Sequence, residues 1–187
     1  MRRLARIVAV AALLLGGVAG CGSGSAKPRS APSSPAGPVA SESYDPDRPS
    51  ASTEQICSDE AAGDIQAALG VQTTQTPAGS WAASDRIYTC KYVYGAGTMT
   101  LTVKQLADAA ATDAYVADAK SRLGNPPTQN VLGNAGFAAP DGSMYVRKDF
   151  KVLYVDVSGL PATLGSHPRS YVGFAVAAVI MSCWAGN

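Results

Sequence analysis

The stretch RIYTCKYVYGAGTMTLTVKQ, residues 86 to 105, decides the fold class of this chain. In its second half, Met99, Leu101 and Val103 alternate with threonines and a lysine. This period of two is typical of a strand with one face on a core and the other in water. A Gly-Ala-Gly turn separates this run from an aromatic and β-branched run before it. The sequence therefore predicts an antiparallel hairpin of residues 86 to 94 and 98 to 105.

Three tyrosines share one face of the first predicted strand. Tyr88, Tyr92 and Tyr94 point to the same side as Cys90, because side chains alternate along a strand. Phenol rings in a row suit stacking on a sugar or lining an apolar groove, so these three are candidate ligand-facing residues. Filling the core beneath helices is the favoured interpretation of the same pattern.

Downstream of the hairpin, the pattern predicts a helix, a second strand pair and a final helix. Residues 106 to 123 are rich in alanine, carry basic residues near their end and stop at a glycine. Residues 143 to 147 and 151 to 157 form the second pair, after a glycine-punctuated segment, 131 to 138, that leads into the sheet. Residues 172 to 184 are apolar nearly all round, which predicts a buried helix too short to cross a membrane.

Upstream of the hairpin, the sequence predicts a short helix and a loop. Ser58 is a good N-cap, acidic residues fill the first turn, and apolar residues recur at helical spacing until Gly70. Residues 71 to 84 have no period and predict a loop, with Trp81 packing back on the core. The order helix, hairpin, helix, hairpin, helix predicts an α+β fold, with an antiparallel sheet of four or five strands and helices packed on one face.

The first twenty residues carry the features of an export signal. Three arginines precede an apolar run too short to span a bilayer, and small residues then lead directly to Cys21. Small residues that end in a cysteine resemble the lipobox of bacterial lipoproteins, where that cysteine receives a diacylglycerol and becomes the mature N-terminus. The resemblance implies a signal peptide over residues 1 to 20, lipidation of Cys21, and an anchor on the extracytoplasmic face of the cell membrane. An ordinary secreted protein cleaved near Ala19 is the alternative.

The mature chain divides into a tether and one domain. Residues 21 to 55 hold the lipidated cysteine and then serine, proline, alanine and glycine with almost nothing large to bury, which predicts disorder. Residues 56 to 187 form a single α+β extracytoplasmic domain, long enough to bury one core. Losing residues 1 to 20 removes three arginines and lowers the formal charge from +1 to about −2, so nucleic acid is not an expected partner.

Three cysteines lie beyond the signal, in a compartment where disulfides persist. With Cys21 acylated, Cys57, Cys90 and Cys183 allow three pairings, and their spacing alone does not choose among them. We favour Cys57 with Cys90, because that bridge closes a loop of about 34 residues and ties a helix too short to be stable alone to the neighbouring strand. In the apolar last helix, we expect Cys183 to be a buried free thiol.

Residue types that carry catalysis or hold metals are scarce. The only histidine, His167, precedes a proline where a helix should start, and the serines beside it lack a nucleophile-elbow context. One histidine and dispersed carboxylates supply no clustered ligands, so the sequence predicts no catalytic residue, no cofactor and no metal. It favours a non-enzymatic binding or interaction module of the cell envelope, whose partner is an unknown envelope protein or a small ligand. The alternatives are a small envelope hydrolase and a carrier or sensor of an apolar ligand.

A second resemblance covers residues 57 to 157. Its motifs are Cys57 ahead of a short helix, Leu69-Gly70 at the end of that helix, Cys90-Lys91-Tyr92, and Leu132-Gly133-Asn134-Ala135 before strands. Together they resemble small actinobacterial lipoproteins that carry domains of unknown function. The resemblance implies the fold and a bridge between Cys57 and Cys90, with no activity to carry over. Cys183 departs from this two-cysteine pattern.

Replacing Cys21 tests the lipid anchor. We expect Cys21→Ala to release the protein to the medium, or to leave it uncleaved and without acyl chains, because each buried methylene contributes about 0.8 kcal/mol to membrane binding. Immunoblots of membrane and medium fractions measure this, with Ser23→Ala as the matched control that keeps the cysteine. A processed Cys21→Ala protein that stays on the membrane would contradict the anchor.

Overall fold

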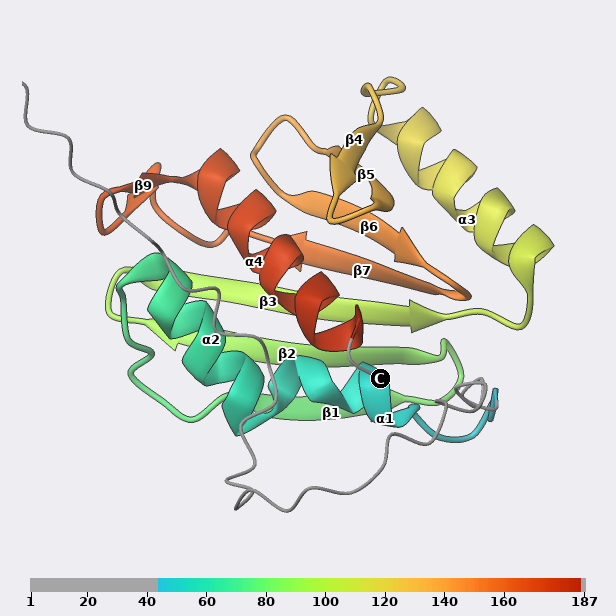
Figure 1. Cartoon of the computed structure of the whole chain (residues 1–187), viewed down its shortest axis with the longest axis horizontal. Helices are drawn as coiled ribbons and strands as arrows, with labels where there is room; N and C mark the ends of the chain where they lie inside the picture. Colours follow the sequence, from blue (N-terminus) through green and yellow to red (C-terminus); the bar gives the residue numbers. More distant parts are fainter. Residues whose placement is uncertain (1–43, 186–187) are drawn as a thin grey trace, which may run out of the picture.

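The structure is a computed structural model that describes residues 44–185 (Figure 1). Its seven-stranded antiparallel sheet has the order β1-β2-β3-β7-β6-β5-β4. The strands of this sheet are β1 Ala78–Ala82, β2 Ile87–Tyr94, β3 Gly97–Gln105, β4 Gln129–Val131, β5 Asn134–Ala138, β6 Met144–Lys148 and β7 Lys151–Asp156. A small second sheet pairs β8, Thr163–Leu164, with β9, His167–Pro168. The helices are α1 Ala51–Glu54, the 3-10 helix η1 Gln55–Cys57, α2 Asp59–Leu69, α3 Ala109–Arg122 and α4 Arg169–Ala185.

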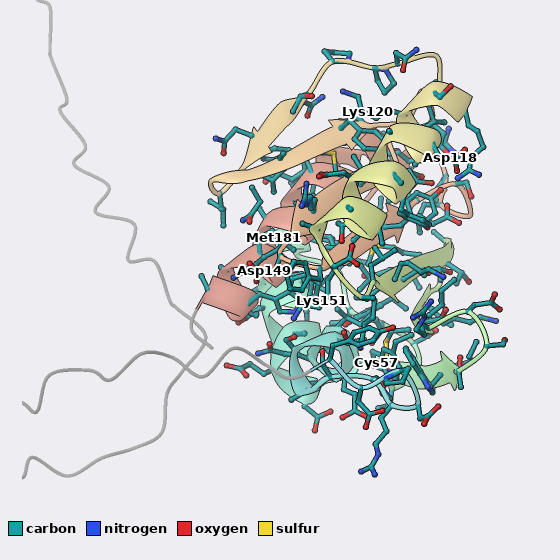
Figure 2. All side chains as sticks on the ribbon, turned by 90° about the vertical axis from the view of Figure 1, so that its right-hand side faces the viewer. Cys57, Asp118, Lys120, Asp149, Lys151 and Met181 are labelled. Atoms are coloured by element: carbon teal, nitrogen blue, oxygen red, sulfur yellow. A yellow bond between two sulfur atoms is a disulfide. The ribbon has the colours of Figure 1, made fainter. Side chains whose placement is uncertain are left out.

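The sheet has two unlike faces. Its inner face, covered by α2 and α4, holds the core, and β3 contributes Met99, Leu101 and Val103 to it. The outer face carries the alternate residues of each strand, such as Thr100 and Thr102, which are only half-buried. Figure 2 shows α3, with Asp118 and Lys120, on the side of the sheet opposite α4. The helices therefore lie on both faces, with α3 alone on the outer one.

Several predicted elements are confirmed. Ser58 caps α2, since its Oγ accepts the Ala61 N–H at 3.1 Å, and Gly70 ends that helix in the left-handed conformation with φ of 64°. The hairpin of β2 and β3, helix α3, the pair of β6 and β7, and helix α4 all form where the pattern placed them. Within residues 44–185, no helix combines the length and the apolar character needed to cross a bilayer.

The predicted sheet of four or five strands with helices on one face is wrong. The expected loop over residues 71 to 84 contains β1, which pairs along its whole length with β2. Its Ala-Gly-Ser-Trp-Ala sequence has little intrinsic strand preference, so tertiary pairing decides its conformation. At Gly79 the absent side chain makes room for a neighbouring ring, because a Cβ there would lie 1.9 Å from the Tyr88 hydroxyl.

The segment of residues 131 to 138 is also more than a lead into the sheet. It contains β5 and the end of β4, and these two strands form a hairpin through a tight turn at Leu132 and Gly133. Both turn residues have positive φ, 48° and 84°, as a two-residue hairpin turn requires. Leucine rarely adopts this conformation, so the usual Asn-Gly signal is missing from the sequence.

The folded body begins before the predicted domain boundary at residue 56. Residues 50–57, which form α1 and η1, contact the core instead of continuing the tether. The Trp184 indole N–H donates to the Ser52 carbonyl at 2.7 Å, and the Tyr92 hydroxyl donates to the Ile56 carbonyl at 2.7 Å. Composition missed this because hydrogen bonds to the backbone, and not large side chains, hold most of the segment. The predicted signal peptide, Cys21 and the tether up to residue 43 lie outside the described residues.

Cys57 and Cys90 are bonded, with their Cα atoms 5.5 Å apart, which confirms the favoured pairing. The bridge joins the residue before α2 to the middle of β2. Cys183 is buried as expected, but it is not a free thiol, so that expectation is wrong. An apolar surrounding predicts that a side chain is buried and does not predict whether its sulfur is bonded.

Removing the bridge should cost a large share of the stability. We expect the double variant Cys57→Ala and Cys90→Ala to unfold with a free energy about 3 to 4 kcal/mol lower, because the bridge constrains a long loop in the unfolded chain. Urea denaturation followed by circular dichroism measures the change. Oxidised wild-type protein is the control, and an unchanged midpoint in the variant would contradict the role given to the bridge.

Candidate binding surface on the outer face

The three tyrosines singled out in the sequence lie on the inner face. Tyr92 is 0% exposed and Tyr94 is 3% exposed, so neither ring is available to a ligand. Tyr88 is half-buried over Gly79. Burial raises the pKa of Tyr94 to about 12, and burial followed by the neighbouring phenols Tyr94 and Tyr88 raises the pKa of Tyr92. The structure thus places Tyr92 and Tyr94 in the core.

The two buried phenols differ in one respect. Tyr92 donates its hydrogen bond to the Ile56 carbonyl, whereas the Tyr94 hydroxyl has no hydrogen-bond partner among the described residues. A buried hydroxyl without a partner destabilises the fold, since it has lost its water without replacement. Tyr94 therefore contributes through its ring alone.

The register of the sheet gathers a different set of side chains on the outer face. Six residues from six neighbouring strands stand directly opposite one another in a single row. In spatial order they are Ser80, Thr89, Thr102, Tyr154, Tyr145 and Phe137. Three hydroxyl side chains thus continue into three aromatic rings, at the strand spacing of about 4.8 Å. We call this set the hydroxyl–aromatic row.

The two ends of the row differ in exposure. Phe137 is buried, Tyr145, Tyr154, Thr102 and Thr89 are half-buried, and Ser80 is exposed. Helix α3 explains the difference, because it lies over the Phe137 end. The Lys120 ammonium of α3 sits 5.8 Å from the centre of the Phe137 ring. Among residues 44–185, no helix lies over strands β1 to β3 on this face (Figure 2).

The three rings of the row are stacked. The Phe137 and Tyr145 centroids are 4.9 Å apart with the planes at 8°, and the Tyr145 and Tyr154 centroids are 4.3 Å apart with the planes at 24°. Burial raises the pKa of Tyr145 to about 12, helped by the nearby phenols Tyr154 and Tyr115. The pKa of Tyr154 is also raised, chiefly by burial. Both hydroxyls therefore stay protonated at neutral pH and can donate hydrogen bonds.

Charges of both signs border the row. On one side, the register aligns Lys91, Thr100 and Asp156. On the other side, Arg147 pairs with Asp113 of α3, and the Lys104 ammonium donates to the Asp85 carbonyl. The carboxylates of Asp156 and Asp113 thus lie among the cations, so the described residues of this face set up no extended field of one sign.

A shallow hollow elsewhere is a weaker candidate. It measures about 450 Å³ and lies between α2 and residues 73–77. Its lining is mostly polar, with Asp59, Gln66 and three threonines, and it is widely open to solvent. A carrier of an apolar ligand needs an enclosed apolar cavity, which this hollow does not provide.

The sequence pattern predicted one pair of neighbours in the hydroxyl–aromatic row. Tyr145 and Tyr154 fall in the two strands predicted around the tight turn at residues 148–150, so their pairing followed from that hairpin. The position of Tyr154 beside Thr102 could not be predicted from the sequence, because it depends on β3 pairing with β7 across more than forty intervening residues.

The histidine, cysteine and carboxylate side chains of residues 44–185 do not gather into a second site. His167 stacks on Tyr171 at the start of α4, with ring centroids 4.6 Å apart. Within residues 44–185, no three histidine, cysteine or carboxylate side chains lie close enough together to hold a metal ion. Comparison with protein-family models, with curated proteins and with solved structures gives no match for this chain.

The two buried tyrosines provide a matched test of the core. We expect Tyr92→Phe to lower the free energy of unfolding by about 1 to 3 kcal/mol, because it leaves the buried Ile56 carbonyl without its donor. Tyr94→Phe should leave stability unchanged or raise it by up to about 1 kcal/mol, since it removes only an unpaired hydroxyl. Chemical denaturation of both variants measures the difference. Equal losses in the two variants would show that the Tyr94 hydroxyl has a partner.

Proposed function

We propose that this chain is a lipid-anchored, non-enzymatic binding module on the extracytoplasmic face of the cell membrane, and that it binds through the uncovered half of its outer sheet face. The observation that carries the proposal is the difference in exposure between the two ends of the hydroxyl–aromatic row. Helix α3 covers one half of the face, and no helix of the described residues covers the half formed by β1 to β3, which we call the open half.

The side chains of the open half favour binding. Thr89, Thr98, Thr100 and Thr102 are short and have restricted χ1 rotamers. A surface made of such residues loses little side-chain entropy when it is covered, whereas lysine and glutamate lose much more. Their hydroxyls can both donate and accept hydrogen bonds. The surface is therefore already organised before a ligand arrives.

The proposed lipid anchor determines where in the cell the binding face would lie. The small residues ending in Cys21 support lipidation there, and the residues up to 43 separate the acyl chains from the described domain. A chain of that length, if extended, reaches several tens of ångströms. The binding face would then be held within the envelope close to the membrane, where its partner or ligand is concentrated.

Blocking the open face tests the proposal. Protein carrying Cys21→Ala, which has no acyl chains to hold it in the membrane, is mixed with isolated cell envelopes, which are then sedimented; the wild-type face and both variants below are compared in this background. We expect Thr89→Lys to reduce the retained fraction about tenfold, because a long charged side chain would cover the floor of the face. Thr163→Lys, an exposed position in β8, is the matched control and should be retained like the wild type. Equal retention of wild type and Thr89→Lys would contradict binding through this face.

A further inference from the structure

We propose that the hydroxyl–aromatic row binds a neutral carbohydrate chain across Tyr154, Thr102 and Thr89. This inference rests on the proposed binding function and adds the chemical class of the ligand. It follows from the orientation of the rings, from the hydroxyls beside them and from the balance of charge around both.

The stacked rings present a flat face toward the threonines. The centroids of neighbouring rings are separated by about one strand spacing. The plane of each ring is therefore roughly perpendicular to the direction of the row. Tyr154 is the last ring of the stack. One of its faces meets Tyr145, and the other is turned toward Thr102, its partner on β3. No other ring of the described residues stacks on that second face.

A pyranose ring fits this corner chemically. The C–H groups of one sugar face carry partial positive charge and pack well against the electron-rich face of a phenol. The hydroxyls at the edge of the sugar would then lie over Thr102 and Thr89, whose side chains can donate and accept. Tyr154 supplies the wall of the site, and the threonines supply its floor.

The row can hold more than one sugar unit. Thr89 and Ser80 continue it to the exposed edge strand β1, and no helix in the described part of the chain lies above them. Asp156 and Thr100 lie in the adjacent row, and a carboxylate is a strong acceptor for sugar hydroxyls. A linear oligosaccharide could therefore run from Tyr154 toward β1.

Other ligand classes fit less well. An anionic polymer would need a run of cations, whereas Lys91 and Lys104 lie in different rows of the face and Asp156 shares the row of Lys91. An apolar ligand would leave the threonine hydroxyls without partners. A protein partner would need large exposed side chains as anchors, whereas Ile87 and Val93, the apolar residues of β2 on this face, are half-buried.

Calorimetric titration of the full-length protein in detergent tests the inference. The probes are neutral hexasaccharides of glucose, mannose, galactose and arabinose, with polygalacturonate as the anionic comparison. We expect at least one neutral probe to bind and polygalacturonate not to bind. Tyr154→Ala should weaken binding about tenfold, because it removes the wall of the site. Tyr154→Phe keeps the ring and should stay within about threefold of the wild type.

Two further variants test whether the loss of binding is specific to this site and whether it arises from misfolding. Tyr171→Ala removes an exposed tyrosine of α4, on the other side of the sheet, and should leave binding unchanged. If Tyr154→Ala does not fold, Thr102→Lys obstructs the same corner without removing a stacked ring, and it should abolish binding. Binding that survives both Tyr154→Ala and Thr102→Lys would overturn the site.

The result also separates this inference from the function on which it rests. If no neutral probe binds, while Thr89→Lys still prevents retention by envelopes, the carbohydrate assignment is wrong and the binding face stands. If Thr89→Lys is retained like the wild type, the proposed function fails. Tight binding of polygalacturonate would overturn the neutral class in favour of an anionic one.

Discussion

The segment of residues 50–57 is the constraint on which the rest of the structure depends. It accepts a buried hydrogen bond from Trp184 at the end of α4 and another from Tyr92 in β2, and it is bonded to β2 through Cys57. The Lys148 ammonium donates to the Trp184 carbonyl, where the helix dipole favours a cation. Sheet, last helix and first segment are thereby joined at one place, and the inner face is closed there.

Because the core is closed on the inner face, residues of the outer face can be selected for binding instead of for stability. Every long strand contributes buried apolar residues to the inner side, so the stability of the sheet comes mainly from that side. Helix α3 has only Thr112 and Ala119 fully buried, and it covers the outer face just over the aromatic end of the row. The open half can therefore be built from threonine and serine, whose hydroxyls suit a ligand, without weakening the core.

Local sequence patterns predicted most of the helices and strands, whereas pairing between distant segments determined β1 and which residues meet at the site. The alternation at Met99, Leu101 and Val103, the cap at Ser58 and the stop at Gly70 each act within a few residues, so the pattern located β3 and α2 correctly. β1 has no such pattern and exists because β2 pairs with it. The same limit applies to the site: which tyrosine stands beside Thr102 depends on the pairing of β3 with β7, which no short window of sequence contains.

The two sets of tyrosines show what separates a core residue from a candidate ligand contact. Tyr92 and Tyr94 alternate along one strand as regularly as any exposed platform, and Tyr145 and Tyr154 lie in strands of similar composition. The difference arises from the helices. After Arg169, α4 has no charged residue and must be buried on most sides, so it packs on the face that offers the largest apolar side chains. Helix α3 has few large apolar side chains and buries only Thr112 and Ala119 fully, so it can leave Tyr154 at the boundary between the stacked rings and the part of the sheet without a described helix.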